Sequence, residues 1–516
     1  MRSGVLTAIP GVAIALSLCF MQERSSGAEL AASLRRELER YSPGEKLPSS
    51  RALVEQHRVS PVTVSRALAQ LAAEGLVVTR PGAGAFRAAP RAEAPRPVDT
   101  SWQEIALSAE PAGDQVPRSV DATGVLATLA PAAPGVIEFD GGYLHTDLQP
   151  ERALAAALAR AGRRPGAWSR PPVGGVPELR AWFAREIAGA GGPLGANDVL
   201  ITGGGQSALT AALRALAAPG APVLVESPTY PGVLAVARAS GLRPVPVPID
   251  ADGVRTDLLA EAFRASGARL FVCQPLFQNP TGAVLAAERR REVLRVVRAA
   301  GAFVIEDDFA RLLGHADGPA LPPTLMAEDR DGSVVHVRSL TKASSPNLRV
   351  GALAARGPVL DRLRAIQVVD SFFVSRPLQE AALELVGSPA WPRHLRLIAG
   401  ELAARRDALT AALHRQLPAF TAHRPPGHDP VPGGPYVPPG GFHLWLRLPE
   451  GVDEAALTGA ALRAGVAVAA GRPYFAAEPP GACLRLSFAG ASGTGEIAEG
   501  VRRLRTACTE LGVAVD

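Results

Sequence analysis

Lys342 is one of only two lysines in this chain of 516 residues, the other being Lys46, whereas 52 of the 54 basic side chains are arginines. Abundant alanine, glycine and proline suggest a GC-rich coding bias, which replaces any lysine that has only to be a cation. An ε-amine, unlike a guanidinium, can lose its proton and attack a carbonyl group. Lys342 is therefore a candidate nucleophile, with chance persistence of both lysines as the alternative.

Four polar segments follow apolar runs that resemble strands. They are Thr202–Gln206, which opens a helix, Asn279–Gly282, Glu306–Asp308 and Ser339–Lys342. The carboxyl ends of parallel strands meet at one edge of a sheet, so these segments are expected to lie together. Backbone amides in the glycine-rich turn and at the start of the following helix favour a phosphate. Each segment also has a simpler interpretation when it is taken alone. Thr202–Gln206 fits a tight turn, Asn279–Gly282 fits an ordinary Asn-Pro turn, and the acids of Glu306–Asp308 fit side chains that cap a helix or face solvent.

The elements that must position these segments alternate between strands and helices. The strand-like runs are residues 199–202, 223–226, 244–249, 270–274, 303–306, 334–337 and 350–354. Because these runs are apolar on both faces and helices separate them, they predict an α/β fold with a mostly parallel sheet covered on both sides. From about residue 390 the pattern changes to helix, strand, helix and strand, which predicts a smaller α+β domain.

Residues 28–88 have a character of their own. Leucines spaced four residues apart predict a helix over 28–41, a shorter helix ends near Gln56, and Pro61 suits the first position of a third helix over 61–74. Two short strands, 76–79 and 84–87, follow around a Pro-Gly turn, which completes a winged helix-turn-helix. The segment has a net charge of +3. A positive charge favours contact with DNA phosphates, but a charged surface that only faces solvent explains it equally well.

The N-terminal extension, the linker and the cysteines indicate which compartment suits the protein. Residues 1–27 form an N-terminal extension whose apolar run resembles a signal peptide; it is short for a membrane span, and a true start at Met21 is the preferred interpretation. Residues 89–135 are rich in proline and alanine and predict a semi-stiff linker. The four cysteines are far apart, so neither a zinc or other metal site nor a disulfide framework is predicted, and a reducing compartment fits.

Together the four segments resemble the core of the fold-type-I aminotransferases, which use pyridoxal phosphate (PLP). The N-terminal segment resembles the GntR-type winged helix-turn-helix, so the whole chain resembles the MocR-like regulators over residues 28–88 and 136–510. Further matches are Gly174–Arg180, Glu226–Pro231, Gly440–His443 and Leu484–Phe488. The resemblance implies a PLP-binding large domain over 136–390 and a small domain over 391–516.

The resemblance also implies roles for individual residues. Lys342 would form a Schiff base with the aldehyde of PLP, Asp307 would pair with the pyridine nitrogen, Asn279 would donate to the phenolic oxygen, and Tyr230 would stack on the ring. Arg485 would bind a substrate carboxylate. The phosphate would be held by Gly204, Gly205, Gln206, Ser339 and Arg349.

Candidate DNA contacts come from the first domain. They are Arg51, Ser60, Thr63, Arg66, and the wing residues Arg80 and Gly82. Pro61 stands where the family often carries arginine, which makes the target of this helix hard to infer.

The resemblance implies a regulator that binds double-stranded DNA and senses PLP, or an amino-acid or amine adduct of it. Fold-type-I sites lie at a dimer interface, so a homodimer is expected by analogy, and the expected compartment is the cytoplasm. The alternative is a functional aminotransferase whose N-terminal domain is accessory or vestigial. Phe309 stands two residues after Asp307, where MocR-like proteins usually carry tyrosine, so the efficiency of transamination is left open.

Overall fold

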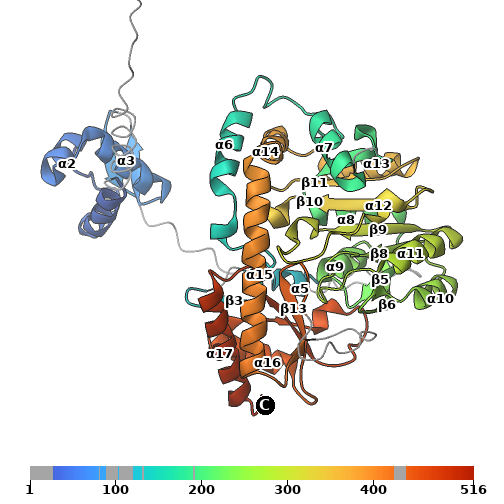
Figure 1. Cartoon of the computed structure of the whole chain (residues 1–516). Coiled ribbons are helices and arrows are strands. Elements are labelled where there is room, and N and C mark those ends of the chain that lie inside the picture. The colour runs from blue at the N-terminus through green and yellow to red at the C-terminus, as the bar shows by residue number, and fades with distance from the viewer. Residues whose placement is uncertain are drawn as a thin grey trace, which may run out of the picture. The chain divides into compact units, whose positions relative to one another are not determined.

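The computed structural model describes residues 27–80, 82–88, 103, 120–130, 133–189, 192–422 and 437–515. The chain divides into two compact units, residues 1–110 and 111–516, and each is described by itself (Figure 1). The expected extension over 1–27 lies outside the described residues except for its last member. Of the expected linker over 89–135, only residues 103, 120–130 and 133–135 are described.

The first unit is a helical core with a two-stranded wing. Residues 27–37 are helical and run into η1 (Leu38–Arg40), followed by α2 (Ser50–His57), α3 (Pro61–Ala73) and the antiparallel hairpin β1 (Val77–Arg80) and β2 (Gly84–Arg87). Buried leucines, valines and alanines from the three helices and the hairpin form one cluster. The predicted winged helix-turn-helix is therefore present, with each predicted element within a few residues of its expected bounds.

The second unit is built on an eight-stranded sheet. Its strands are β4 (Val199–Thr202), β5 (Pro222–Ser227), β6 (Arg243–Asp250), β7 (Gly253–Val254), β8 (Leu270–Cys273), β9 (Phe303–Asp308), β10 (Val334–Ser339) and β11 (Gly351–Ala354), in the order β4-β11-β10-β9-β8-β5-β6-β7. The pairs from β10 to β6 are parallel, whereas β11 is antiparallel to both of its neighbours. This mixed, mostly parallel sheet confirms the predicted α/β class.

Helices cover both faces of this sheet (Figure 1). They are α7 (Pro177–Ala188), α8 (Gly205–Leu216), α9 (Pro231–Ala239), α10 (Thr256–Ser266), α11 (Ala287–Ala299), α12 (Leu325–Glu328) and α13 (Val359–Ser371). Two further helices, α6 (Glu151–Ala161) and α14 (Arg376–Val386), pack against each other, and α14 also contacts α7. Successive strand residues fall into different core clusters: Val304 packs in the cluster that includes α7 and α11 side chains, and Ile305 in the cluster with α8 and α9. This alternation fixes which strand-end side chains face each layer of helices.

The C-terminal part is a smaller α+β layer, as predicted. The long helix α15 (Ala390–Gln416) packs against α17 (Thr494–Glu510), and α16 (Glu454–Arg463) also contacts α17 (Figure 1). An antiparallel sheet has the order β12 (Thr421–Ala422), β13 (His443–Arg447), β16 (Cys483–Ser487) and β15 (Ala469–Ala470). A separate parallel pair joins β3 (Ile137–Glu138) to β14 (Val466–Ala467), which ties the start of the predicted large domain to this layer.

Among the described residues, no helix combines the length and the apolar character needed to cross a membrane.

Candidate functional site

A cavity of about 280 Å³ lies at the carboxyl ends of the central strands, beside the N-terminus of α8. It brings together segments that lie far apart in the sequence. Of the residues predicted to hold the cofactor and substrate, all but Gly204 line it: Gly205, Gln206, Tyr230, Asn279, Asp307, Ser339, Lys342, Arg349 and Arg485. The edge-of-sheet argument therefore places the predicted side chains around one space.

Lys342 lies in the short helical turn η5 (Thr341–Ala343) that follows β10. Its Nζ donates to the carbonyl of Gly142 at 2.7 Å and sits 3.9 Å from the ring centroid of Tyr143. Burial lowers the pKa of Lys342 to about 7, and Arg485 acts in the same direction. A substantial fraction of this amine is therefore neutral, and nucleophilic, near neutral pH.

Asp307 projects from β9 toward the cavity, on the side of the sheet that α8 covers. Burial raises its pKa to about 7, against a hydrogen bond from Gln274 that lowers it. The Gln274 Nε2 donates to Oδ2 of Asp307 at 2.6 Å, and the Gln274 Oε1 accepts from the backbone amide of Asn279 at 3.0 Å. One buried amide thus connects two of the predicted cofactor ligands.

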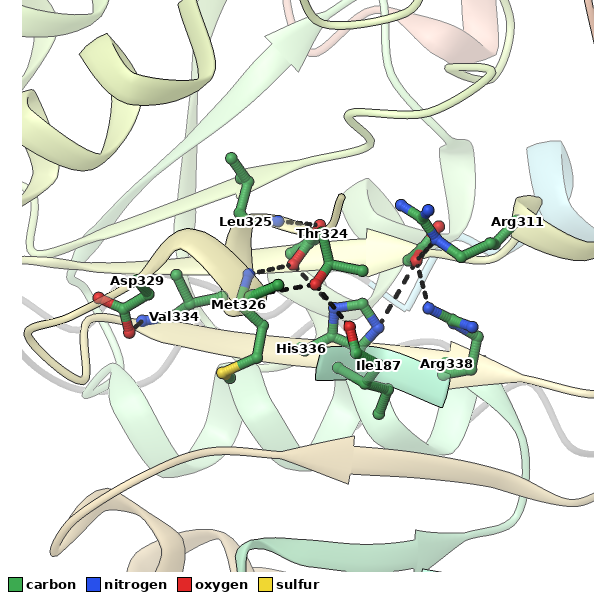
Figure 2. A network of polar contacts seen from close by, with 12 residues as sticks. Ile187, Arg311, Thr324, Leu325, Met326, Asp329, Val334, His336 and Arg338 are labelled. Atoms are coloured by element: carbon green, nitrogen blue, oxygen red, sulfur yellow. Dashed lines mark hydrogen bonds and ion pairs between the residues drawn. The ribbon is translucent and has the colours of Figure 1, made fainter. Parts of the chain in front are cut away.

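The neighbours of Asp307 belong to the opposite face of the sheet, where their partners His336, Arg338 and Arg311 lie close together (Figure 2). Glu306 accepts from the backbone amides of Leu325 and Met326 at 2.8 and 3.0 Å, and its Oε2 lies 2.8 Å from Nδ1 of His336. Glu306 and His336 are at most 1% exposed. These bonds anchor the end of β9 to α12 and β10.

Asp308 belongs to the same network (Figure 2). Its Oδ2 accepts from Arg311 Nε at 2.6 Å and from Arg338 Nη2 at 2.7 Å. Burial raises the pKa of Asp308, but these two guanidinium groups hold it at about 2. Glu306, Asp308 and His336 have potential metal-ligand atoms within 4.8 Å of one another, yet two arginines already pair with Asp308, and backbone amides together with His336 already occupy the Glu306 carboxylate.

The opposite end of the cavity suits a phosphate. Gly204 has a φ of +95°, and a Cβ there would lie 2.9 Å from Nη2 of Arg349, which itself donates to the carbonyl of Gly203 at 2.6 Å. Ser339 Oγ accepts from the amide of Thr341 at 3.2 Å. The amides at the N-terminus of α8, a guanidinium and a hydroxyl therefore converge, which is the donor set that binds phosphate.

Arg485 projects from β16 and is 3% exposed. Its Nη2 donates to the carbonyls of Asp140 and Gly141, the latter at 3.0 Å, and its Nη1 to Asn279 Oδ1 at 3.5 Å. Its Cζ lies 5.6 Å from the ring centroid of Tyr474. A guanidinium at the wall of a cavity has the donor geometry that can bind a carboxylate in two places.

Several lining residues had no role assigned from the sequence, although Pro231, Phe309, Thr341 and Phe442 lie in motifs or at a position that the sequence singled out. They are Gly124, Val125, Thr128, Leu129, Gly142, Tyr143, Leu209, Pro231, Gln274, Phe309, Thr341, Phe442 and Tyr474. Gln274 and Thr341 sit at strand ends beside predicted residues, so the edge-of-sheet argument applies to them as well. Residues 124–129, within and after α5 (Thr123–Leu126), gave no signal because they fall in the Pro/Ala-rich segment that predicted a linker.

In the first unit the predicted DNA contacts divide by exposure. Arg51, Ser60 and Arg66 are exposed, whereas Thr63 is 4% exposed and its Oγ1 lies 2.8 Å from Ser60 Oγ. The Ser60 hydroxyl also accepts from the Thr63 amide at 3.1 Å, so Ser60 is the N-cap of α3 and Thr63 is its partner in the cap.

In the wing, the guanidinium of Arg80 lies 4.8 Å from the Phe86 ring centroid, and Gly82 has a φ of +73° in the turn. The exposed face of α3 also carries Val62, Ser65 and Ala69, which the sequence did not single out.

Family models match both parts of the chain: "Aminotransferase class I and II" over residues 136–504 and "Bacterial regulatory proteins, gntR family" over residues 27–86. The chain belongs to the aminotransferase class I and II family and carries a GntR-family domain in front. Among curated relatives of this family, a 2-aminoadipate transaminase of Thermus thermophilus is 32% identical over 72% of this chain and 89% of its own length. The predicted MocR-like combination of domains is thus confirmed.

Relatives that carry regulator names match nearly the whole chain. The uncharacterized HTH-type transcriptional regulator YjiR of Escherichia coli is 30% identical over 87% of this chain and 91% of the relative. The HTH-type regulator TauR of Rhodobacter capsulatus is 27% identical over 91% of this chain and 93% of the relative. Among solved structures, the α-aminoadipate aminotransferase LysN of Thermus thermophilus, complexed with N-(5'-phosphopyridoxyl)-L-leucine, aligns with a TM-score of 0.68 and 30% identity over 76% of this chain and 96% of that one.

The cofactor of this family is PLP, and the cavity fits it. Arg485 Nε, Thr341 Oγ1 and the Tyr474 hydroxyl are buried polar atoms without a hydrogen-bond partner in the described part of the chain. The absent side chain at Gly204 leaves room beside Arg349, and Lys342 offers a buried amine of lowered pKa. The space beside Arg349 fits the phosphate of PLP, the unpartnered polar atoms fit its polar substituents, and the amine of Lys342 fits its aldehyde.

Proposed function

We propose that this protein is a cytoplasmic, homodimeric transcriptional regulator that binds operator DNA through residues 28–88 and senses PLP, or an amino-compound adduct of it, at Lys342. The observation that carries the proposal is the presence in one chain of a winged helix-turn-helix and of one cavity lined by nine of the residues that the resemblance assigns to PLP and substrate. Relatives with regulator names span both parts of the chain, which supports the same conclusion.

When bound, PLP supplies an aldehyde that condenses with amines and a pyridine ring that withdraws electrons. Lys342 provides the amine that holds the cofactor, and its pKa of about 7 leaves it reactive at physiological pH. Asp307 binds the ring nitrogen and keeps its proton in place, while Tyr230 packs against the ring. Arg349 and the amides that begin α8 bind the phosphate.

Arg485 receives the carboxylate of an amino-acid effector. To bind that carboxylate, Arg485 gives up some of its hydrogen bonds to the carbonyls of Asp140 and Gly141. These two residues closely follow β3. Because β3 pairs with β14, this exchange connects effector binding to the position of the C-terminal layer. A shift of that layer within a dimer changes the spacing of the two DNA-binding domains, which must match the separation of the operator half-sites.

On the DNA side, Arg66 projects from the exposed face of α3, and Arg51 lies in the first turn of α2. These side chains bind phosphates and base edges when α3 lies in the major groove.

Two measurements test the proposal. Purified protein reconstituted with PLP should show the absorbance band of lysine-linked cofactor, and Lys342→Ala should remove it. A wild-type protein that stays colourless with excess PLP contradicts the cofactor assignment.

The second measurement uses DNA from upstream of its own and neighbouring genes in a mobility-shift assay at two salt concentrations. Arg66→Ala should weaken binding, whereas Arg152→Ala, an exposed arginine of α6 in the other unit, serves as the matched control. The regulator proposal is contradicted if the protein binds DNA with no sequence preference, or if the two variants change DNA binding equally.

A functional aminotransferase is the second candidate, because the lysine, aspartate and arginine equipment is present and a transaminase is 32% identical. Phe309, which lines the cavity where the resemblance expects tyrosine, speaks against efficient turnover. Turnover of an amino donor and a 2-oxo acid at ordinary enzymatic rates, without DNA binding, would favour this candidate.

A further inference from the structure

The exposed face of α3 is built mainly from small and apolar side chains over its first turns. From the start of the helix it carries Pro61, Val62, Ser65, Arg66 and Ala69. The other face of the same helix packs into the core of the first unit, and Val62 lies outside that core cluster with 53% of its surface exposed. The fold therefore does not account for a branched apolar side chain at this position.

The polar groups at the start of α3 are bonded within the domain. Pro61 has no backbone N–H to offer, and the Ser60 hydroxyl accepts from the amide of Thr63 at 3.1 Å. The hydroxyls of Ser60 and Thr63 also lie 2.8 Å apart and bond to each other. Further along the helix, Gln70 Nε2 donates to Glu74 at 3.1 Å. The first turn of α3 thus presents carbon surface rather than hydrogen-bonding groups.

Val62 and Arg66 stand one turn apart on the exposed face. Side chains at positions i and i+4 of a helix are neighbours on one side, so a DNA surface that meets Arg66 also meets Val62. The first residues of a helix that lies in the major groove contact base edges. In that groove the C5-methyl of thymine is the apolar group that a base pair presents, so it is the group that Val62 suits.

We propose that Val62 is a specificity-determining residue of the DNA-binding domain, and that its γ-methyl groups pack against the C5-methyl of a thymine in the operator. The inference rests on the proposed binding of operator DNA through residues 28–88 and adds the base pair that is recognised. Each half-site of the operator carries a thymine at the position that faces Val62. A C·G pair there lacks the methyl group and places a polar edge against carbon.

The test uses the full-length protein with excess PLP and a duplex that this protein selects from a random pool. Each thymine of the selected duplex is replaced in turn by deoxyuridine, which removes the C5-methyl and leaves the base pairing unchanged. At the thymine that faces Val62, the replacement should weaken binding by about fourfold, the equilibrium effect of exposing one buried methyl group.

A pair of variants assigns this effect to Val62. Val62→Ala removes both γ-methyl groups at an exposed helical position, where alanine is well tolerated. Val78→Ala is the matched control, because Val78 is 47% exposed and lies in β1 of the same unit. The deoxyuridine penalty at one thymine of each half-site should disappear in Val62→Ala and stay at about fourfold in Val78→Ala.

The outcomes separate the two proposals. If the full-length protein selects no sequence from the pool, the proposed function fails and this inference fails with it. If it selects a sequence, but no thymine shows a deoxyuridine penalty that depends on Val62, the role of Val62 is wrong and the regulator stands. A penalty that is lost equally in both variants also overturns the role of Val62, because the effect then comes from the domain as a whole and not from this contact.

Discussion

Replacing Gln274 by leucine isolates the support that the chain gives to Asp307. Gln274 is 3% exposed and bridges two of the proposed cofactor ligands: it donates to Asp307 at 2.6 Å and accepts from the Asn279 amide at 3.0 Å. Leucine has a similar size and neither polar atom, so it removes both bonds while filling most of the space.

The expected loss follows from the type of each bond. A hydrogen bond to an ionised group contributes about 1.5–3 kcal/mol, so losing the bond to Asp307 should weaken PLP binding roughly tenfold to a hundredfold. The orphaned Asn279 amide should lower the free energy of unfolding by a further ~1–3 kcal/mol.

The pKa of Asp307 also predicts how the PLP affinity of the variant changes with pH. Burial raises the pKa of Asp307 to about 7 and Gln274 opposes this, so in Gln274→Leu the pKa lies higher still and Asp307 keeps its proton at neutral pH. The affinity of the variant for PLP should therefore recover as the pH rises from 7 to 9, because Asp307 ionises there.

The assay is a titration of apoprotein with PLP at pH 7 and pH 9, beside a denaturation curve for each variant. Gln367→Leu is the control: Gln367 is equally buried at 3%, its Nε2 donates to the Ile201 carbonyl at 2.6 Å, and it does not line the cavity. Its stability should fall while its PLP affinity holds. An unchanged affinity in Gln274→Leu, or a loss that is the same at both pH values, refutes the reasoning.

Four further predictions concern the same site. With a pKa of about 7, Lys342 is neutral in about one tenth of molecules at pH 6 and about nine tenths at pH 8, so reconstitution with PLP, followed by absorbance, should be several-fold faster at pH 8. Gly204→Ala should weaken PLP by about tenfold in the same titration, since its Cβ meets Arg349 and its φ of +95° disfavours alanine. Asp308→Asn, which leaves the buried Arg338 and the partly buried Arg311 without their counter-ion, should lower the free energy of unfolding by about 3–5 kcal/mol in urea. Phe309→Tyr should raise any transamination rate roughly tenfold, measured as 2-oxo acid formed, by restoring a hydroxyl beside the cofactor.

The apolar runs predicted the strands well, and the errors have a physical cause. The run 199–202 coincides with β4, but the run 303–306 was expected to end two residues before β9 does. The hydrophobic pattern stops at the first acid, whereas the strand continues because Glu306 and Asp308 are buried and bonded on the far side of the sheet. Long-range partners, rather than local preference, extend this strand.

Strand-end motifs predicted where the site residues lie, but they could not predict the segment 124–129. Its composition is that of a linker, and its position depends on contact between Gly124 and Pro473, which lie hundreds of residues apart. In the first unit, Thr63 shows that a motif can also point to a residue whose side chain is buried. Its place in the helix-turn-helix predicted a DNA contact, while the structure shows a buried side chain engaged in a helix cap.

Which acid of the run 306–308 faces the cavity depends on packing that the sequence does not reveal. Both faces of the sheet are buried, so the preceding apolar residues do not alternate with polar ones and give no register. In the structure, Asp308 takes two guanidinium groups and a pKa of about 2, whereas Asp307 takes one amide bond, from Gln274, among the described residues and a pKa of about 7. The chain thus pairs Asp308 with two guanidinium groups, whereas Asp307 has Lys342 nearby but no bonded cation among the described residues. A protonated pyridine nitrogen is the kind of group that completes Asp307, which is why the uncompensated acid, rather than the paired one, indicates the ligand.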